Sequence, residues 1–377
     1  MIYEDVTRTV GRTPLVELKR LAADRPNRLL AKLEMRNPCG SVKDRVGLAL
    51  IEDAEERGLI APGATLIEAT AGNTGIGLAS AAAVKGYHLI LVMPETMSEE
   101  RAKLLRHLGV DVRLTPGMLM ADAVRRAKEL QREIPGAFLI DQFNNRTNVD
   151  VHRRTTAEEI WSDSNGQIDV FVAAVGTGGT LMGVASVLKE RCPDIRIVAV
   201  EPKDSAVLSG GCAGQHRIPG IGVGFVPPLF DRGLVDEIFP VSNEDAFAAV
   251  RRLARREGIS AGVSSGAAIH AALTILDRPE MVGRRLQFFW PTPATGTRRR
   301  ASSTYHVRNS SASTLQADFG PLRAATCRTA VTWLGMQPSK ATGRGDGTAF
   351  REMHFQLTAC WFSKNQDQPG PVFEHTP

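Results

Sequence analysis

The sequence predicts an α/β fold built on buried parallel sheets, and three observations lead to this prediction. From about residue 40 to residue 285, short apolar runs of strand length alternate with longer helix-like segments. Several of these runs end at a glycine-rich turn that opens a helix, which is the order expected of parallel strands with crossover helices. The chain has 377 residues, of which 43% are hydrophobic, and this is enough for two or three domains with large cores.

The elements follow from local signals taken in chain order. Ser41 can cap a helix that Gly58 closes, and Gly109 can end another. Short apolar runs without helical spacing are read as strands. We therefore expect helices near 41–57, 76–84, 99–108, 181–189 and 267–276, and strands near 65–67, 89–93, 138–141, 170–175 and 195–200.

The character of the chain changes after residue 285. Residues 286–377 contain a low-complexity patch at 301–313 and no sustained period of either 2 or 3.6. They hold ten of the 46 basic residues and only five of the 41 acidic ones, so residues 1–285 carry 36 of each. The net charge of +5 therefore belongs to this tail, and a nucleic-acid partner is not predicted.

The remaining composition excludes several classes of protein. No apolar run is long enough to span a membrane, and the N-terminus carries acids and lacks the apolar core of a signal peptide. The five cysteines show no metal-ligand spacing, so we expect reduced thiols, no metal site and a cytoplasmic location.

Four short motifs could carry chemistry. Lys43, in NPCGSVKDR, stands in the first turn of a helix, where the helix dipole would lower its pKa and favour an amine nucleophile; alone, it could be a surface lysine. TAGNTG, with Asn73, follows an apolar run and can bind an anion through backbone amides, or can simply cap its helix. GTGGT at 176–180 suits a phosphate, or is a tight turn. In SSGAA one serine is expected to be the N-cap of the helix, and His270 beyond it is expected to be structural.

The order of these motifs is more informative than any one of them. NPCGSVKDR, TAGNTG, DQFNN, GTGGT, EPKDSAVLSGG, GIGVGFVP and SSGAA together resemble the cysteine synthase family, from about residue 5 to residue 285. That family belongs to the fold-type-II pyridoxal-phosphate enzymes, similar to tryptophan synthase β. The resemblance implies two doubly wound domains with the cofactor, pyridoxal 5′-phosphate, in the cleft between them.

The resemblance also implies roles for matching residues. Lys43 corresponds to the lysine that carries the cofactor and moves the Cα proton, and Ser264 to the partner of the pyridine nitrogen. The implied cofactor-binding residues are Lys43, Asn73, Gly176, Thr177, Gly178, Gly179, Thr180 and Ser264. The implied contacts of the substrate carboxylate are Thr70, Gly72, Thr74 and Gln142. A neutral serine leaves the pyridine nitrogen of the cofactor unprotonated, so the ring withdraws electrons less strongly. This suits β-replacement better than transamination.

The implied activity is that of a cysteine synthase, which replaces the acetate of O-acetylserine by sulfide. Cystathionine β-synthase and O-phosphoserine sulfhydrylase are alternatives within the family, and a frame-disrupted pseudoenzyme is the alternative from another class. A homodimer is implied, and serine acetyltransferase is a further candidate partner. The expected domains are a large one formed by 1–43 and 151–285, and a small one at 44–150.

Two departures from the family qualify these expectations. Ala71 stands where the family often has serine, which removes one hydroxyl near the substrate. After residue 286 the family's next strand and its following block are not recognisable, whereas a shifted reading frame over residues 289–303 is compatible with a similar block. We therefore expect the frame to change near residue 287, with most of 287–377 out of frame. Gln287, Pro291 and Pro293 suit a central strand poorly, so we also expect this strand to be lost and the chain to be marginally stable.

Overall fold

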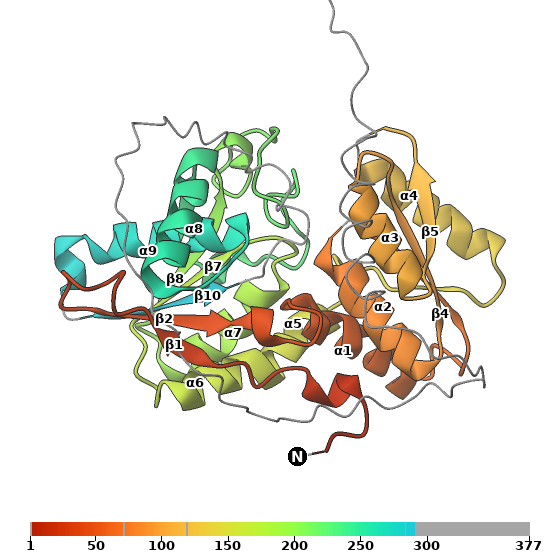
Figure 1. The fold of residues 1–377 in the computed structure, drawn as a ribbon, viewed down its shortest axis with the longest axis horizontal. Helices are drawn as coiled ribbons and strands as arrows, with labels where there is room; N and C mark the ends of the chain where they lie inside the picture. The colour runs from red at the N-terminus through yellow and green to blue at the C-terminus, as the bar shows by residue number, and fades with distance from the viewer. Residues whose placement is uncertain (1, 71, 118–119, 283, 291–377) are drawn as a thin grey trace, which may run out of the picture. The chain divides into compact units, whose positions relative to one another are not determined.

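The computed structural model describes residues 2–70, 72–117, 120–282 and 284–290. Within them the strands form two separate sheets (Figure 1). The first has the order β1-β2-β10-β7-β8-β9, in which only β1 runs antiparallel to its neighbour. Its strands are β1 (Leu15–Glu17), β2 (Arg28–Leu33), β7 (Val170–Ala174), β8 (Arg196–Pro202), β9 (Glu237–Val241) and β10 (Arg285–Trp290).

The second sheet is smaller and wholly parallel, with the order β5-β4-β3-β6. Its strands are β3 (Thr65–Ala69), β4 (His88–Pro94), β5 (Asp111–Thr115) and β6 (Phe138–Leu139). The prediction of an α/β fold with parallel sheets is confirmed.

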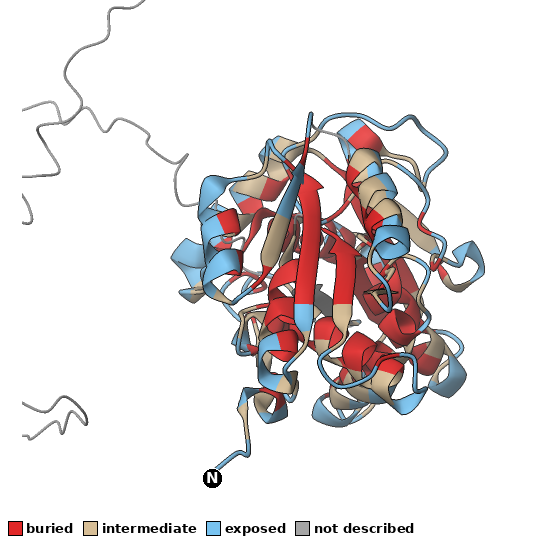
Figure 2. Ribbon diagram, turned by 90° about the vertical axis from the view of Figure 1, so that its right-hand side faces the viewer, coloured by how far each residue is buried: buried red, intermediate tan, exposed pale blue. Residues whose placement is uncertain are grey.

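Helices cover both faces of each sheet, which explains why the central strands are apolar on both sides. In β7, Val172 packs with α8 (Asn243–Glu257) and α9 (Val263–Leu276), whereas Phe171 packs with α7 (Gly179–Arg191) and α6 (Glu158–Asp163). In the smaller sheet, Leu66 packs with α1 (Lys43–Glu56), α2 (Asn73–Lys85) and α3 (Glu99–His107), and Ile67 packs with α4 (Met120–Glu133). Figure 2, which faces the smaller sheet, shows its central strands β3 and β4 as buried along most of their length.

The helix α5 (Thr147–Val151) continues into a π-helical turn, η3 (His152–Ala157), and then into α6. This continuous segment follows the last strand of the smaller sheet and precedes β7 of the larger one. It therefore passes from one sheet to the other, and it brings His152 and Glu159 close to the start of α1.

The expectation that a central strand is lost is wrong for residues 285–290. β10 lies between β2 and β7, and Gln287 is paired with Leu30 on one side and Phe171 on the other. A ladder needs only backbone N–H and C=O groups, and residues 285–290 contain no proline. Asp169 also holds the start of the strand, since its carboxylate accepts hydrogen bonds from the backbone nitrogen (2.7 Å) and Nε (3.0 Å) of Arg285. Pro291 and Pro293 lie outside the described residues.

Candidate active site

A cavity of about 290 Å³ collects most of the residues that the motifs singled out. Its walls come from the start of α1, the β3–α2 turn, the segment after β6, the β7–α7 turn and the start of α9. The predicted residues that line it are Lys43, Thr70, Gly72, Asn73, Thr74, Gln142, Gly176, Thr177 and Ser264. A larger hollow of about 830 Å³ beside β1 and α6 contains none of them.

Lys43 is the first residue of α1, and its turn is fixed by close contact with α2. A Cβ at Gly77 of α2 would overlap the carbonyl oxygen of Lys43, so only glycine allows this approach of the two helices. Burial lowers the pKa of the Lys43 amine from 10.5 to about 8, and the nearby carboxylate of Glu34 opposes that shift. The predicted direction is confirmed, but its main cause is desolvation and not the helix dipole.

The turn between β3 and α2 places two buried hydroxyls in the cavity wall. Thr70 Oγ1 accepts a hydrogen bond from the backbone nitrogen of Gly72 (3.2 Å), which orders the turn. Thr74 Oγ1 donates to Gln142 Oε1 (2.7 Å), so two predicted carboxylate contacts, far apart in the sequence, are joined directly. Residue 71 lies outside the described residues.

The glycine loop between β7 and α7 is shaped for a group that approaches its backbone. Gly178 has φ of +89°, and a Cβ at Gly179 would overlap Asn148 Oδ1, so neither position accepts a side chain without distortion. Gly178 and Thr180 line a small cavity of about 30 Å³ that Lys43 and Thr177 also line. The loop and Lys43 therefore border the same space.

Two buried side chains, those of Asn148 and His152, hold the threonines of this loop by hydrogen bonds. Asn148 Nδ2 donates to Thr177 Oγ1 (2.9 Å), and His152 Nε2 is hydrogen-bonded to Thr180 Oγ1 (3.1 Å). Burial, with Lys43 and Arg45 nearby, lowers the pKa of His152 well below its ordinary value, so its ring is neutral. The loop thus receives rigid support without an added charge.

Ser264 lines the cavity, but the expectation that a serine of SSGAA caps the helix is wrong. α9 begins at Val263 with Gly262 as its N-cap, and no side chain makes a cap hydrogen bond. Ser264 lies inside the first turn, which leaves its hydroxyl at the cavity wall. His270 is half-buried, with its Nε2 3.9 Å from Asp245, and does not line the cavity.

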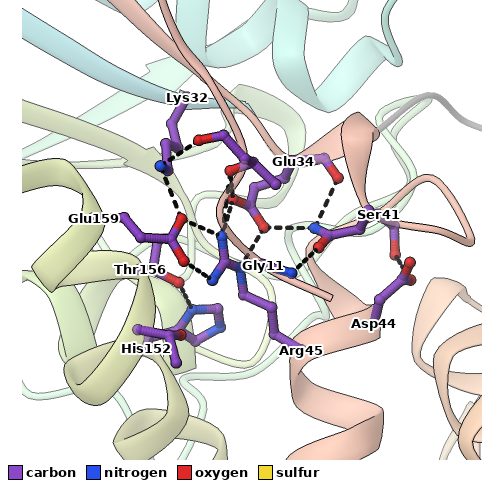
Figure 3. Close-up of polar contacts among 12 residues, drawn as sticks. Gly11, Lys32, Glu34, Ser41, Asp44, Arg45, His152, Thr156 and Glu159 are labelled. Carbon is purple, nitrogen blue, oxygen red and sulfur yellow. Dashed lines mark hydrogen bonds and ion pairs between the residues drawn. The ribbon is translucent and has the colours of Figure 1, made fainter. Parts of the chain in front are cut away.

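A buried ionic network that the motifs did not reveal surrounds Arg45, two residues after Lys43 (Figure 3). The Arg45 guanidinium donates to both oxygens of Glu34 (2.8 and 2.9 Å) and to both oxygens of Glu159 (2.6 and 2.7 Å). Lys32 joins Glu159 from β2, with Nζ 2.9 Å from Oε2. These contacts connect β2 and α6 to the helix that carries Lys43, and they lower the pKa of Glu159 to about 2 despite its partial burial.

Among the described residues no group of three or more histidine, cysteine or acidic side chains could hold a metal ion. Over the same residues, no helix combines the length and apolar character of a membrane span.

The fold and the cavity define a class of enzyme that handles a phosphate-bearing cofactor next to a lysine. Residues 6–285 match the family model described as pyridoxal-phosphate dependent enzyme, and the chain belongs to this family. The resemblance to cysteine synthases is also confirmed. The chain is 46% identical over 301 residues to cysteine synthase A of Escherichia coli (strain K12). The aligned region covers 77% of this chain and 92% of that protein. It is 46% identical over 304 residues to the cysteine synthase of Staphylococcus aureus (strain N315), and this alignment covers 80% of this chain and 97% of that protein. The crystal structure of cysteine synthase from Entamoeba histolytica superposes with a TM-score of 0.76 at 41% identity, covering 83% of this chain and 93% of that one.

The residues of the cavity fit the cofactor of this family. The glycine loop opens α7 and offers backbone N–H groups and two threonine hydroxyls to a phosphate. Lys43 supplies an amine of lowered pKa at the same space, and Ser264 supplies a neutral hydroxyl. This set of groups matches a phosphate, an aldehyde and a ring nitrogen.

Proposed function

We propose that this chain converts O-acetylserine and sulfide to cysteine and acetate, with pyridoxal 5′-phosphate as cofactor. One observation carries the proposal: a single cavity is lined by a lysine of lowered pKa, by Gly176 and Thr177 of the glycine loop, and by the Thr74–Gln142 pair. The cysteine synthases among its relatives support the choice of reaction.

The cofactor would be held by residues at both ends of the cavity. Lys43 would bind it covalently, Gly176, Thr177, Gly178, Gly179 and Thr180 would surround its phosphate, Asn73 its 3′ oxygen and Ser264 its pyridine nitrogen. When bound, the cofactor withdraws electrons from the substrate Cα and makes the Cα proton removable.

The chain's own groups perform the proton transfer and the orientation. The substrate carboxylate binds at Thr70, Gly72, Thr74 and Gln142, which fixes the amino acid so that Cα faces Lys43. The substrate amine would first replace Lys43 on the cofactor, which frees the Lys43 amine. This amine, whose pKa is about 8, would then accept the Cα proton while the Cβ–O bond breaks and acetate leaves. Hydrosulfide then forms the new Cβ–S bond, and Lys43 returns the proton to Cα.

The domain division and the assembly are part of this proposal. The two sheets support a large domain formed by 1–43 and 151–285 and a small one at 44–150, with β10 extending the large one to residue 290. We place the enzyme in the cytoplasm as a homodimer, with serine acetyltransferase as a candidate partner.

The origin of the tail, residues 286–377, is also part of the proposal. The family match ends at residue 285, which supports a change of reading frame near residue 287. Resequencing codons 285–305 tests this, and a restored frame should raise melting temperature and cofactor occupancy together. The tail would be established as a native element if the 377-residue chain already melts cooperatively with full cofactor occupancy and deletion of residues 300–377 harms it.

The activity test compares cysteine formation by cofactor-loaded wild type and Lys43→Ala. We expect wild type to form cysteine and Lys43→Ala to form essentially none, because only the amine is lost. Lys103→Ala, on the exposed face of α3, is the matched control and should retain full activity. Faster turnover of O-phosphoserine, or of serine with homocysteine, would assign the chain to the alternatives, and no turnover of any substrate would identify a pseudoenzyme.

A further inference from the structure

Glu68 is a buried acid beside the cavity that the proposed mechanism does not use. It lies in β3 and is 2% exposed. Strand alternation places it on the same face as Leu66, which packs against α1 and α2. A carboxyl group in such a place costs stability unless it makes hydrogen bonds, so its contacts indicate what it is for.

Among the described residues, both hydrogen bonds that Glu68 accepts from beyond its own strand come from one residue. The backbone N–H of Gln142 donates a hydrogen bond to Glu68 Oε2 (3.3 Å), and its side-chain Nε2 donates one to Glu68 Oε1 (3.3 Å). The Oε1 of the same carboxamide accepts from Thr74 Oγ1 (2.7 Å). The carboxamide of Gln142 is therefore held at both ends, by Glu68 on one side and Thr74 on the other.

Gln142 and Thr74 line the cavity, whereas Glu68 does not. An amide nitrogen carries two hydrogens, and the bond to Glu68 uses one of them. With the carboxamide plane fixed, the second hydrogen has one direction in which to meet a ligand. A fixed donor of this kind loses less conformational entropy on binding than a mobile one.

We propose that Glu68 is a positioning residue, which orients Gln142 so that its amide hydrogen meets the carboxylate of the amino-acid substrate. This inference rests on the proposed function, in which Gln142 contacts that carboxylate. Glu68 itself touches neither substrate nor cofactor.

The protonation state of Glu68 suits this role. Burial, aided by the negative charge of Asp141, raises its pKa to about 8 against the hydrogen bonds from Gln142. The carboxyl group is therefore mostly neutral at pH 7, and it does not set a negative charge behind the site of a bound carboxylate.

The decisive variant is Glu68→Gln, which keeps the shape but replaces one carboxyl oxygen by an amide nitrogen. That nitrogen cannot accept a hydrogen bond from Gln142, whereas a carboxyl oxygen can do so in either protonation state. We expect the KM of O-acetylserine to rise roughly tenfold, as for the loss of one hydrogen bond. The kcat/KM of sulfide should not change, because sulfide reacts in the separate second half of the cycle. Glu56→Gln, at the exposed end of α1, is the matched control and should alter neither value.

Equilibrium binding to the holoenzyme gives a second readout that does not depend on turnover. L-Alanine has the amine and carboxylate of the substrate but no leaving group, and alaninol lacks the carboxylate. Calorimetry should show Glu68→Gln weakening L-alanine roughly tenfold while alaninol is unaffected. If Glu68→Gln does not fold, Glu68→Asp, which withdraws the acceptor by one methylene, should show the same pattern.

Combination with Gln142→Ala shows whether Glu68 acts through Gln142. The double variant should bind L-alanine no more weakly than Gln142→Ala alone. If Gln142→Ala weakens L-alanine but Glu68→Gln does not, the positioning role is overturned and the carboxylate site stands. If Gln142→Ala has no effect on L-alanine, the carboxylate site in the proposed function is wrong, and the positioning role falls with it.

Discussion

Replacing Arg45 by methionine tests how much the buried ion pairs of Arg45 with Glu34 and Glu159 stabilise the fold. Arg45 is 2% exposed and Glu34 is completely buried, so the substitution leaves at least one carboxylate buried without its cation. Removing one partner of a buried ion pair costs about 3–5 kcal/mol, because the remaining charge is desolvated and uncompensated. Against a total stability of about 5–15 kcal/mol, Arg45→Met should lower the urea midpoint severely.

The assay is equilibrium urea denaturation followed by far-ultraviolet circular dichroism. Arg57→Met is the matched control, since the Arg57 side chain is 59% exposed in its pair with Asp53 and should cost below about 1 kcal/mol. Adding Glu34→Gln to Arg45→Met removes the stranded charge and should recover about 1 kcal/mol or more. A loss below about 1 kcal/mol for Arg45→Met, or strict additivity with Glu34→Gln, would refute this reasoning.

Three further predictions concern the cavity. Recombination of the apoprotein with pyridoxal phosphate should accelerate as pH rises and level off above about 8, because only the neutral Lys43 amine attacks an aldehyde; a rate still rising steeply at pH 10 would contradict the lowered pKa. Gly178→Asp should lower cofactor affinity, because it adds strain at a φ of +89° and a carboxylate beside the phosphate, and unchanged occupancy by absorbance would exclude the loop from phosphate binding. For Glu68, whose pKa rises from 4.5 to about 8 on folding, the native state binds the extra proton between these values. The unfolding free energy of wild type should therefore fall with pH across that window by up to about 1.4 kcal/mol per unit relative to Glu68→Gln, and parallel pH profiles would disprove the shift.

Local signals in the sequence predicted the alternation of elements, and the motifs together with the family resemblance predicted nine of the residues that line the cavity. The turns at Asn73 and Gly178 were recognisable because glycines and small polar residues there follow an apolar strand directly. The cap of α9 was misassigned because Gly262, two residues before Ser264, takes the extended N-cap conformation that serine was expected to take.

What could not be predicted depends on contacts between distant parts of the chain. Glu159 lies 114 residues from Arg45, and Gln142 lies 74 residues from Glu68, so no local pattern could link them. β10 was misjudged because prolines beyond it were weighed together with Gln287, although pairing with β2 and β7 needs only the backbone of residues 285–290.

The most direct measurement locates the covalent attachment of the cofactor. The protein is loaded with pyridoxal phosphate, reduced with borohydride, digested and analysed by mass spectrometry. The lowered pKa of Lys43 and its place beside the glycine loop predict a single phosphopyridoxyl adduct on Lys43, lost in Lys43→Ala and retained in Lys103→Ala. An adduct on another lysine, or none on the loaded wild-type protein, would contradict the assignment of this cavity as the active site.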